Sequence, residues 1–175
     1  VGDIESLPFL EAIRQLRNEM SKNQTIFIHL TLVPYLNAAD ELKTKPTQHS
    51  VKELRGIGIQ PDLLICRCER KITDTDKEKM ALFCNINARN IIQALDVTNI
   101  YELPVVLNKE KLDERVLYNL NIKKYKKANL KKWREISNLQ KNPKNSVNIG
   151  IIGKYIDLKD AYKSLSEALY HSGIP

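Results

Sequence analysis

The sequence predicts an α/β fold, a parallel sheet with flanking helices. Two runs, residues 25–33 and 63–68, are apolar on both faces, which is typical of strands that helices cover on both sides of a parallel sheet. Helical patterns follow each run, and this alternation is typical of α/β proteins. A length of 175 residues, 42% of them hydrophobic and 28% charged, excludes collagen-like, mucin-like and wholly disordered chains.

The first helix is predicted by apolar residues that share one face of a 3.6-residue period. These residues are Phe9, Ile13, Leu16 and Met20. Ser6 is the expected cap of this helix, and Pro8 suits its first turn. The strand at 25–33 follows, ends at Pro34, and is expected in the middle of the sheet because both of its faces are apolar.

Turn and cap signals place the next elements. A polar stretch at 37–48 leads into a short helix at 50–57, which Gly56 and Gly58 are expected to stop. The second strand, 63–68, follows the turn at Pro61. Three further helices are predicted, at 73–83 with a Thr or Asp cap, at 88–95 with Asn87 as cap, and at 113–120.

A change of composition at Lys123 predicts three parts: a first domain at 1–122, a basic linker at 123–146, and the start of a second α/β domain at 147–175. The linker contains one short amphipathic helix pattern, with Leu130, Trp133, Ile136 and Leu139 on one face. The last part predicts a strand at 147–152 and a helix at 160–172 with Gly173 as its C-cap. One strand and one helix cannot bury a core, and the chain opens with Val1 instead of Met. We therefore expect a truncated second domain and a processed start or a longer parent protein.

The three cysteines, Cys66, Cys68 and Cys84, are too few for a disulfide framework. Their odd number, without a signal peptide or an apolar run long enough to cross a bilayer, predicts a cytoplasmic protein that is not bound to a membrane. The pair Cys66 and Cys68 could form half of a metal site, but no histidine stands at zinc-finger spacing from it. Cys66 lies in an apolar run, so we expect a buried structural thiol and no metal site.

The net charge of +7 is concentrated in the linker. Its densest cluster consists of Lys123, Lys124, Lys126, Lys127, Lys131 and Lys132. Such a cluster can attract the phosphates of a nucleic acid, although a solvated linker has the same composition. Nucleic-acid binding is therefore kept as an alternative and not as the main hypothesis.

One polar segment is a candidate for binding a polyphosphate. Its residues are Lys43, Thr44, Lys45, Pro46, Thr47 and Gln48. In an extended segment Lys43 and Lys45 project to the same side, where two ammonium groups can hold an anion. The helix that follows has free N–H groups and a dipole that also favour an anion. The alternative is an ordinary exposed loop.

A second candidate group lies at the start of the chain. Asp3, Ile4 and Glu5 are followed by Glu11 and Arg14. The two carboxylates at positions 3 and 5 could accept hydrogen bonds from an amino or hydroxyl group, or could simply favour the positive end of the first helix. By pattern alone, Lys79 is an exposed helix lysine.

At these residues the sequence resembles the CTP synthase family. The matching blocks, in family order, are Gly2-Asp3-Ile4-Glu5-Ser6, residues 43–54, 59–62, 81–85, 153–156 and 160–164. The resemblance weakens between about residues 120 and 144, and Lys159 stands where family members often have Pro.

The resemblance implies an enzyme that converts UTP into CTP. ATP, with Mg²⁺, phosphorylates the uracil O4, and ammonia released from glutamine in a second domain displaces the phosphate. It also implies a homotetramer. This chain would hold the later part of a P-loop-type synthetase layer, an interdomain linker, and the first βα unit of a class I glutamine amidotransferase.

The resemblance also implies a role for each candidate group. Lys43, Thr44, Lys45, Pro46, Thr47, Gln48 and Lys79 would hold the triphosphate of UTP or CTP. Asp3, Ile4, Glu5, Glu11 and Arg14 would lie where the product CTP inhibits, and Leu95, Asp96 and Val97 would border the ATP adenine.

Other family features would lie outside this segment: the phosphate loop, the Mg²⁺-binding carboxylates and the Cys-His-Glu set of the glutaminase. The segment alone is therefore expected to be inactive. Two rival hypotheses remain, a basic nucleic-acid-binding module and a non-catalytic remnant that self-associates.

Overall fold

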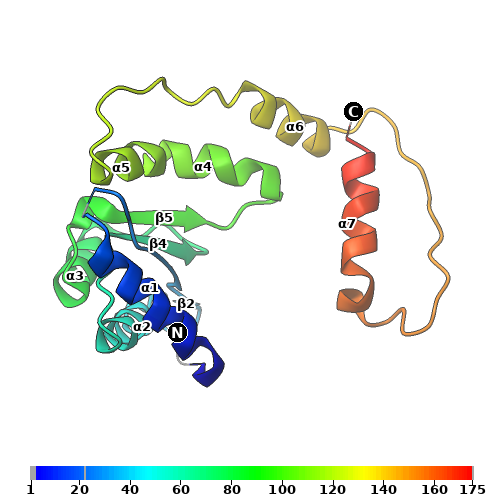
Figure 1. Cartoon of the computed structure of the whole chain (residues 1–175). Helices are drawn as coiled ribbons and strands as arrows, with labels where there is room; N and C mark the ends of the chain where they lie inside the picture. Colours follow the sequence, from blue (N-terminus) through cyan, green and yellow to red (C-terminus); the bar gives the residue numbers. More distant parts are fainter. Residues whose placement is uncertain (1–2, 22, 175) are drawn as a thin grey trace.

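A computed structural model describes residues 3–21 and 23–174 of the chain (Figure 1). Val1, Gly2 and Pro175 lie outside the described residues, and so do the interpretations that depend on them. The helices η1 (Ile4–Ser6) and α1 (Leu7–Glu19) open the described part. Pro8 lies in the first turn of α1 as predicted, but the Ser6 hydroxyl donates to the Asp3 carbonyl and does not cap this helix.

The sheet has three parallel strands in the order β1 (Ile28–Leu32), β4 (Leu63–Cys68) and β5 (Ile91–Leu95). One face carries α2 (Lys45–Gly56) and α3 (Asp74–Cys84), and the other carries α4 (Leu103–Lys109) and α5 (Leu112–Asn119), as Figure 1 shows. The predicted α/β class with a parallel sheet and flanking helices is confirmed.

The core lies between the sheet and the pair α2 and α3. It is formed by Val33, Val51, Leu64, Cys66, Cys68, Ile72, Met80, Cys84 and Ile91. Because side chains alternate along a strand, Leu64, Cys66 and Cys68 of β4 all face this core. Thr73 begins α3, where its hydroxyl accepts a hydrogen bond from the Asp76 amide, so the predicted cap is confirmed.

The predicted helix at 88–95 is wrong. Ala88–Asn90 is a single 3₁₀ turn, η2, and the chain then continues as strand β5. Asn87 does cap this turn, since its side chain accepts from the Arg89 amide, but the strand begins directly after it. Residues 91–94 are all buried, because β4 pairs with β5 and helices cover both of its faces.

The expected position of the first strand is also wrong. Strand β1 is an edge strand of the described sheet, and β4 lies in the middle. His29 and Thr31 of β1 face α2, but Ile28, Leu30 and Leu32 face the other way, and Leu30 is 69% exposed. No described helix covers this half of the second face, so an apolar pattern predicted burial that the described residues do not provide.

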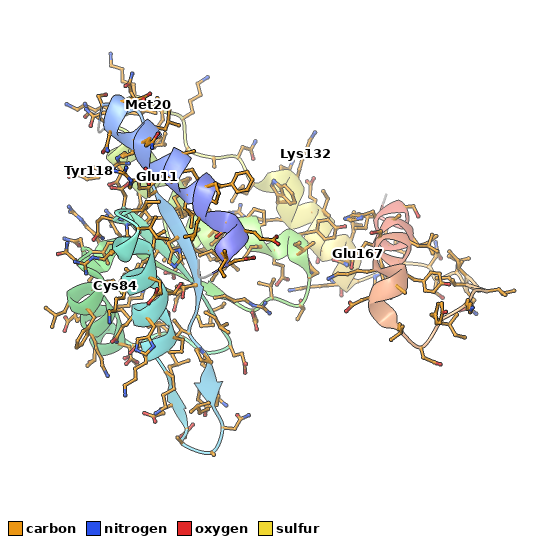
Figure 2. All side chains as sticks on the ribbon, turned by 60° about the horizontal axis from the view of Figure 1, so that its bottom comes forward. Glu11, Met20, Cys84, Tyr118, Lys132 and Glu167 are labelled. Atoms are coloured by element: carbon orange, nitrogen blue, oxygen red, sulfur yellow. The ribbon has the colours of Figure 1, made fainter. Side chains whose placement is uncertain are left out.

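Helix α1 lies on the β1 side of the sheet, and polar contacts attach it there (Figure 2). Arg17 donates to both carboxylate oxygens of Asp62 and stacks on the ring of Phe27. Arg14 lies against Gly58, where an added Cβ would come within 2.8 Å of its Cδ. Gly58 also has a φ of 93°, which suits glycine. The apolar stripe of α1 is not buried, and Phe9 is 72% exposed.

The chain after β5 forms η3 (Ile100–Glu102), then α4 and α5, and then the linker. The predicted linker helix is present as α6 (Lys131–Lys141). No strand forms at 147–152, which is exposed and has no described strand beside it to pair with, so that prediction is wrong. The predicted last helix is present as η4 (Lys159–Tyr162) and α7 (Lys163–Ser172), with Gly173 at the C-cap position.

Candidate functional site

The predicted phosphate and adenine segments meet at one edge of the sheet, where the parallel strands have their carboxyl ends. Ligands of open α/β sheets bind at this edge. The Val33 amide donates to the Arg67 carbonyl, and the Asp96 amide donates to the Cys68 carbonyl, so the segments after β1, β4 and β5 lie side by side. Residues far apart in the sequence are therefore neighbours here.

The segment after β1 forms a short hairpin and then a helix. The hairpin consists of β2 (Tyr35–Leu36) and β3 (Glu41–Leu42), and the Lys43 amide closes it by donating to the Pro34 carbonyl. Helix α2 begins at Lys45, with Pro46 in its first turn. The expected extended segment and the helix start at residue 50 are therefore wrong. A proline stabilises a first helical turn because its missing N–H is not needed there.

The two lysines of this segment are held differently. The ammonium of Lys43 pairs with the carboxylate of Glu41, whereas Lys45 is exposed at the first position of α2. The Thr44 side chain does not cap the helix, but Pro46 has no N–H and Thr47 is fully buried. The Lys45 amide and the helix dipole therefore remain to favour an anion. One helix end and one exposed lysine thus replace the expected pair of parallel lysines.

The hydroxyls of Thr44 and Thr47 are used inside the protein. Thr47 is fully buried, and its Oγ1 donates to the Leu32 carbonyl at 3.1 Å and accepts from Thr31 Oγ1 at 3.1 Å. Thr44 Oγ1 accepts from Gln48 Nε2 at 3.1 Å. The two bonds of Thr47 attach α2 to β1 and fix the position of the lysines. A contact between Thr47 and a phosphate stays a prediction. It would require the bond from the Thr47 hydroxyl to the Leu32 carbonyl to open.

The segment after β5 carries the predicted adenine border. Asp96 is exposed, and its Oδ1 accepts from Arg67 Nε at 2.9 Å. Leu95 ends the strand and is half-buried, as is Val97. Their role beside the adenine stays a prediction.

Two arginines at this edge were missed by the sequence reasoning. Arg67 lies near the end of β4 and bonds Asp96, and Arg70 lies with its guanidinium carbon 4.2 Å from the centre of the Tyr35 ring. Through these contacts, the end of β4 is joined both to the segment after β5 and to the hairpin that precedes α2. A usable signal existed, since every parallel strand in an α/β sheet contributes its carboxyl end to the same edge.

Lys79 lies on α3, which starts at this same edge, and its side chain is exposed. The neighbouring Lys77 holds α3 in place, because its ammonium lies 3.6 Å from a Glu110 carboxylate oxygen. Glu110 also accepts from the side-chain amide of the buried Gln93 at 2.9 Å, and Gln93 accepts from the Ile72 amide. This network positions the helix that carries Lys79.

Among the described residues, no side-chain hydrogen bond or ion pair joins the predicted inhibitory group to the carboxyl edge. Asp3 accepts from the Glu5 amide at 3.1 Å, and the side chains of Ile4 and Glu5 are exposed. Glu11 and Arg14 form a two-pronged ion pair, with N–O distances of 2.8 and 2.7 Å. Arg14 approaches Gly58, which lies at the opposite, amino-terminal edge of β4.

We expect Glu11 to titrate far below an ordinary glutamate. Hydrogen bonds from Arg14 and Gln15 lower the pKa of Glu11 from 4.5 to about 2. A lowered folded pKa means that the pair stabilises the fold above about pH 4.5 and loses this effect as the pH falls through about 2. Carboxyl NMR titration measures this pKa. Arg14→Gln should return the midpoint of Glu11 toward 4.5, and an unchanged midpoint in that variant would contradict the ion pair.

The three cysteines are buried free thiols, as predicted for Cys66. Burial raises the pKa of Cys66 to about 12 and the pKa values of Cys68 and Cys84 to about 11. Buried thiols with raised pKa values are poor nucleophiles. Among the described residues, no group of three histidine, cysteine or acidic side chains is placed to hold a metal ion. No described helix is long and apolar enough to cross a membrane.

Two hollows of the described part lie away from the carboxyl edge. One, of about 480 Å³, lies against η4 and α7 and is lined by apolar residues such as Ile151 and by charged residues such as Asp160 and Glu167. The other, of about 330 Å³, lies between α4 and α6. The candidacy of the carboxyl edge depends on its residues and its topology.

Comparisons with known proteins agree on one family. The family model described as CTP synthase N-terminus matches residues 1–122. The CTP synthase of Pelagibacter ubique is 60% identical over 174 residues, and that of Parvibaculum lavamentivorans is 58% identical over the same length. Each match covers 99% of this chain but only 32% of the relative. The chain therefore spans about a third of the length of these curated relatives.

Proposed function

Because the chain belongs to the CTP synthase family, we propose that it is part of an enzyme that converts UTP into CTP. In this reaction ATP phosphorylates O4 of the uracil, and ammonia attacks C4 and displaces the phosphate. The products are CTP, ADP and inorganic phosphate. The ammonia comes from glutamine in a second domain, and Mg²⁺ accompanies the nucleotide phosphates.

The observation that carries this proposal is the arrangement at the carboxyl edge of the sheet. Lys45 begins α2 at a helix end that no side chain caps, and Lys43 lies just before it. Positive charge and free N–H groups at a helix start favour a phosphate. Asp96 lies two strands away at the same edge, so the proposed triphosphate and adenine sites would flank β4.

The test removes both lysines. We expect the chain to bind UTP weakly and Lys43→Ala with Lys45→Ala to raise the dissociation constant at least tenfold, which is about 1.4 kcal/mol. The matched control is Lys123→Ala with Lys124→Ala, which removes the same charge from the exposed linker. Calorimetric titration with UTP gives both constants. Titration curves that do not differ between wild type and the Lys43 and Lys45 variant would contradict this role.

We also propose that these 175 residues alone do not form CTP, since the family's phosphate loop, metal-binding carboxylates and glutaminase set are expected elsewhere in the parent protein. The purified chain should produce no CTP from UTP, ATP, Mg²⁺ and ammonium, as measured by chromatography. The CTP synthase of a curated relative serves as positive control. CTP formed by this chain at a rate above the uncatalysed background would refute the proposal.

The remaining proposals concern the parent protein. We propose a cytoplasmic homotetramer, and the exposed apolar faces of α1 and β1 are surfaces that a larger assembly could bury. The same exposed faces favour the self-association rival over the nucleic-acid rival. A competition experiment distinguishes nucleic-acid binding from nucleotide binding. If UTP binds at the carboxyl edge of the sheet, unlabelled UTP should displace labelled UTP and RNA should not.

A further inference from the structure

The hollow between α4 and α6 is bordered by charged residues from both helices. Its volume of about 330 Å³ is at the small end of the range for ligand sites, about 300–1,000 Å³. The polar residues that line it are Glu102, Lys109, Arg134, Ser137, Asn138 and Lys141. It therefore joins the first domain to the linker helix.

The carboxylate of this hollow is already satisfied. Glu102 pairs with the ammonium of Lys141 and accepts from Ser137 Oγ at 3.2 Å. The hydrogen bond from Lys141 lowers the pKa of Glu102, so this carboxylate stays ionised and paired. Ser137 is buried, and its hydroxyl accepts from the Asn99 side-chain amide in turn. This set of contacts holds α6 against η3.

The two other cations of the hollow form no such close pair, although the charge of Lys109 also helps to lower the pKa of Glu102. Among the residues that the structure describes, no ion pair joins Lys109 or Arg134 to a carboxylate. With Lys141 they make three cations against the one carboxylate of Glu102. The lining therefore carries a net positive charge of about two, which an anion would neutralise.

The position of Arg134 on its helix strengthens this point. Lys109 and Lys141 lie in the last turns of α4 and α6, where the negative end of a helix dipole stabilises a cation. Arg134 lies near the start of α6, where the dipole disfavours a cation and where the first turn has no acidic residue. The helix dipoles thus stabilise the charges of Lys109 and Lys141 but not the charge of Arg134.

We propose that the hollow between α4 and α6 binds a small phosphate-class anion, inorganic phosphate or a phosphate monoester. Lys109 and Arg134 supply the charge, and the Asn138 side-chain amide supplies a neutral donor. Because its ligands come from both helices, the bound anion holds the linker on the first domain. This site is independent of the nucleotide site at the carboxyl edge, so an experiment can disprove one proposal without disproving the other.

The test titrates the isotope-labelled 175-residue chain with sodium phosphate, and with sodium chloride at equal ionic strength, by NMR. We expect phosphate alone to give saturable shifts, centred on Lys109, Arg134 and Asn138. Shifts that follow ionic strength equally in both salts, or that centre on Lys43 and Lys45, would overturn the proposal. This measurement on the wild-type chain needs no variant to fold.

A matched pair of variants tests the residues. Lys109→Gln with Arg134→Gln should raise the dissociation constant for phosphate at least tenfold. Lys131→Gln with Lys132→Gln removes the same charge from the same region of the chain. Lys131 faces Glu135, and Lys132 lies on the side of α6 away from α4 (Figure 2). This control should bind phosphate as wild type does. An equal loss in both pairs would show attraction to net charge and reject a built site.

Discussion

Leu64→Ala is expected to lower the free energy of unfolding by about 2–5 kcal/mol. Leu64 is fully buried on β4, the middle strand, and packs in the core that α2 and α3 cover. Truncation removes apolar surface from that core and leaves a cavity that a sheet paired on both sides cannot close by moving. Urea unfolding followed by circular dichroism measures the change.

The chain offers a matched control for this effect. Leu82 is the same residue type on α3, but it is 78% exposed. Leu82→Ala should change the free energy of unfolding by no more than about 0.5 kcal/mol, as surface substitutions usually do. Equal losses at Leu64 and Leu82 would contradict the placement of the core.

Asp62→Ala is expected to lower the free energy of unfolding by about 2–4 kcal/mol, since hydrogen bonds to charged groups contribute more than neutral ones. The Asp62 carboxylate accepts from the Phe27 amide at 2.7 Å and from both terminal nitrogens of Arg17, at 3.1 and 3.2 Å. The carboxylate and the guanidinium are both partly buried. The variant leaves the guanidinium and one amide without these partners and loosens α1 from the sheet.

A second substitution separates the charge from the hydrogen bonds. Asp62→Asn keeps an oxygen that can accept from Phe27 but loses the ion pair with Arg17, so roughly half of the loss should remain. Amide hydrogen exchange locates the effect, and α1 should exchange faster in both variants while β4 and β5 change little. Faster exchange in β5 but not in α1 would show that Asp62 does not hold this helix.

Local signals predicted several elements correctly. Thr73 followed by acidic residues begins α3, and the capping bond from Asp76 is present. Cys66 is buried because it belongs to an apolar run that forms the middle strand. Such features depend on neighbours within a few residues, which a sequence shows directly.

The errors have a tertiary origin. Asn87 is a cap signal, but the residues after its single turn form strand β5 because β4 offers a pairing partner about 27 residues earlier. At the candidate site, Thr47 bonds Leu32 and Thr31, which are about 15 residues away in the sequence. No local pattern reveals that this hydroxyl faces inward, or that Arg67 reaches Asp96, directly after the neighbouring strand β5.

The order of the sheet strands has a consequence for how the chain folds. Ile28 pairs with Leu63, roughly 35 residues later, and Leu64 pairs with Ile91, so no two neighbouring strands of this described sheet are joined by a hairpin. Closing such distant pairs costs chain entropy before any contact repays it. We therefore expect the helices to form early and the pairing of the distant strands to limit the folding rate. Substitutions that favour α2 and α3 locally should speed refolding, while changes on the exposed side of β1 should leave its rate nearly unaltered.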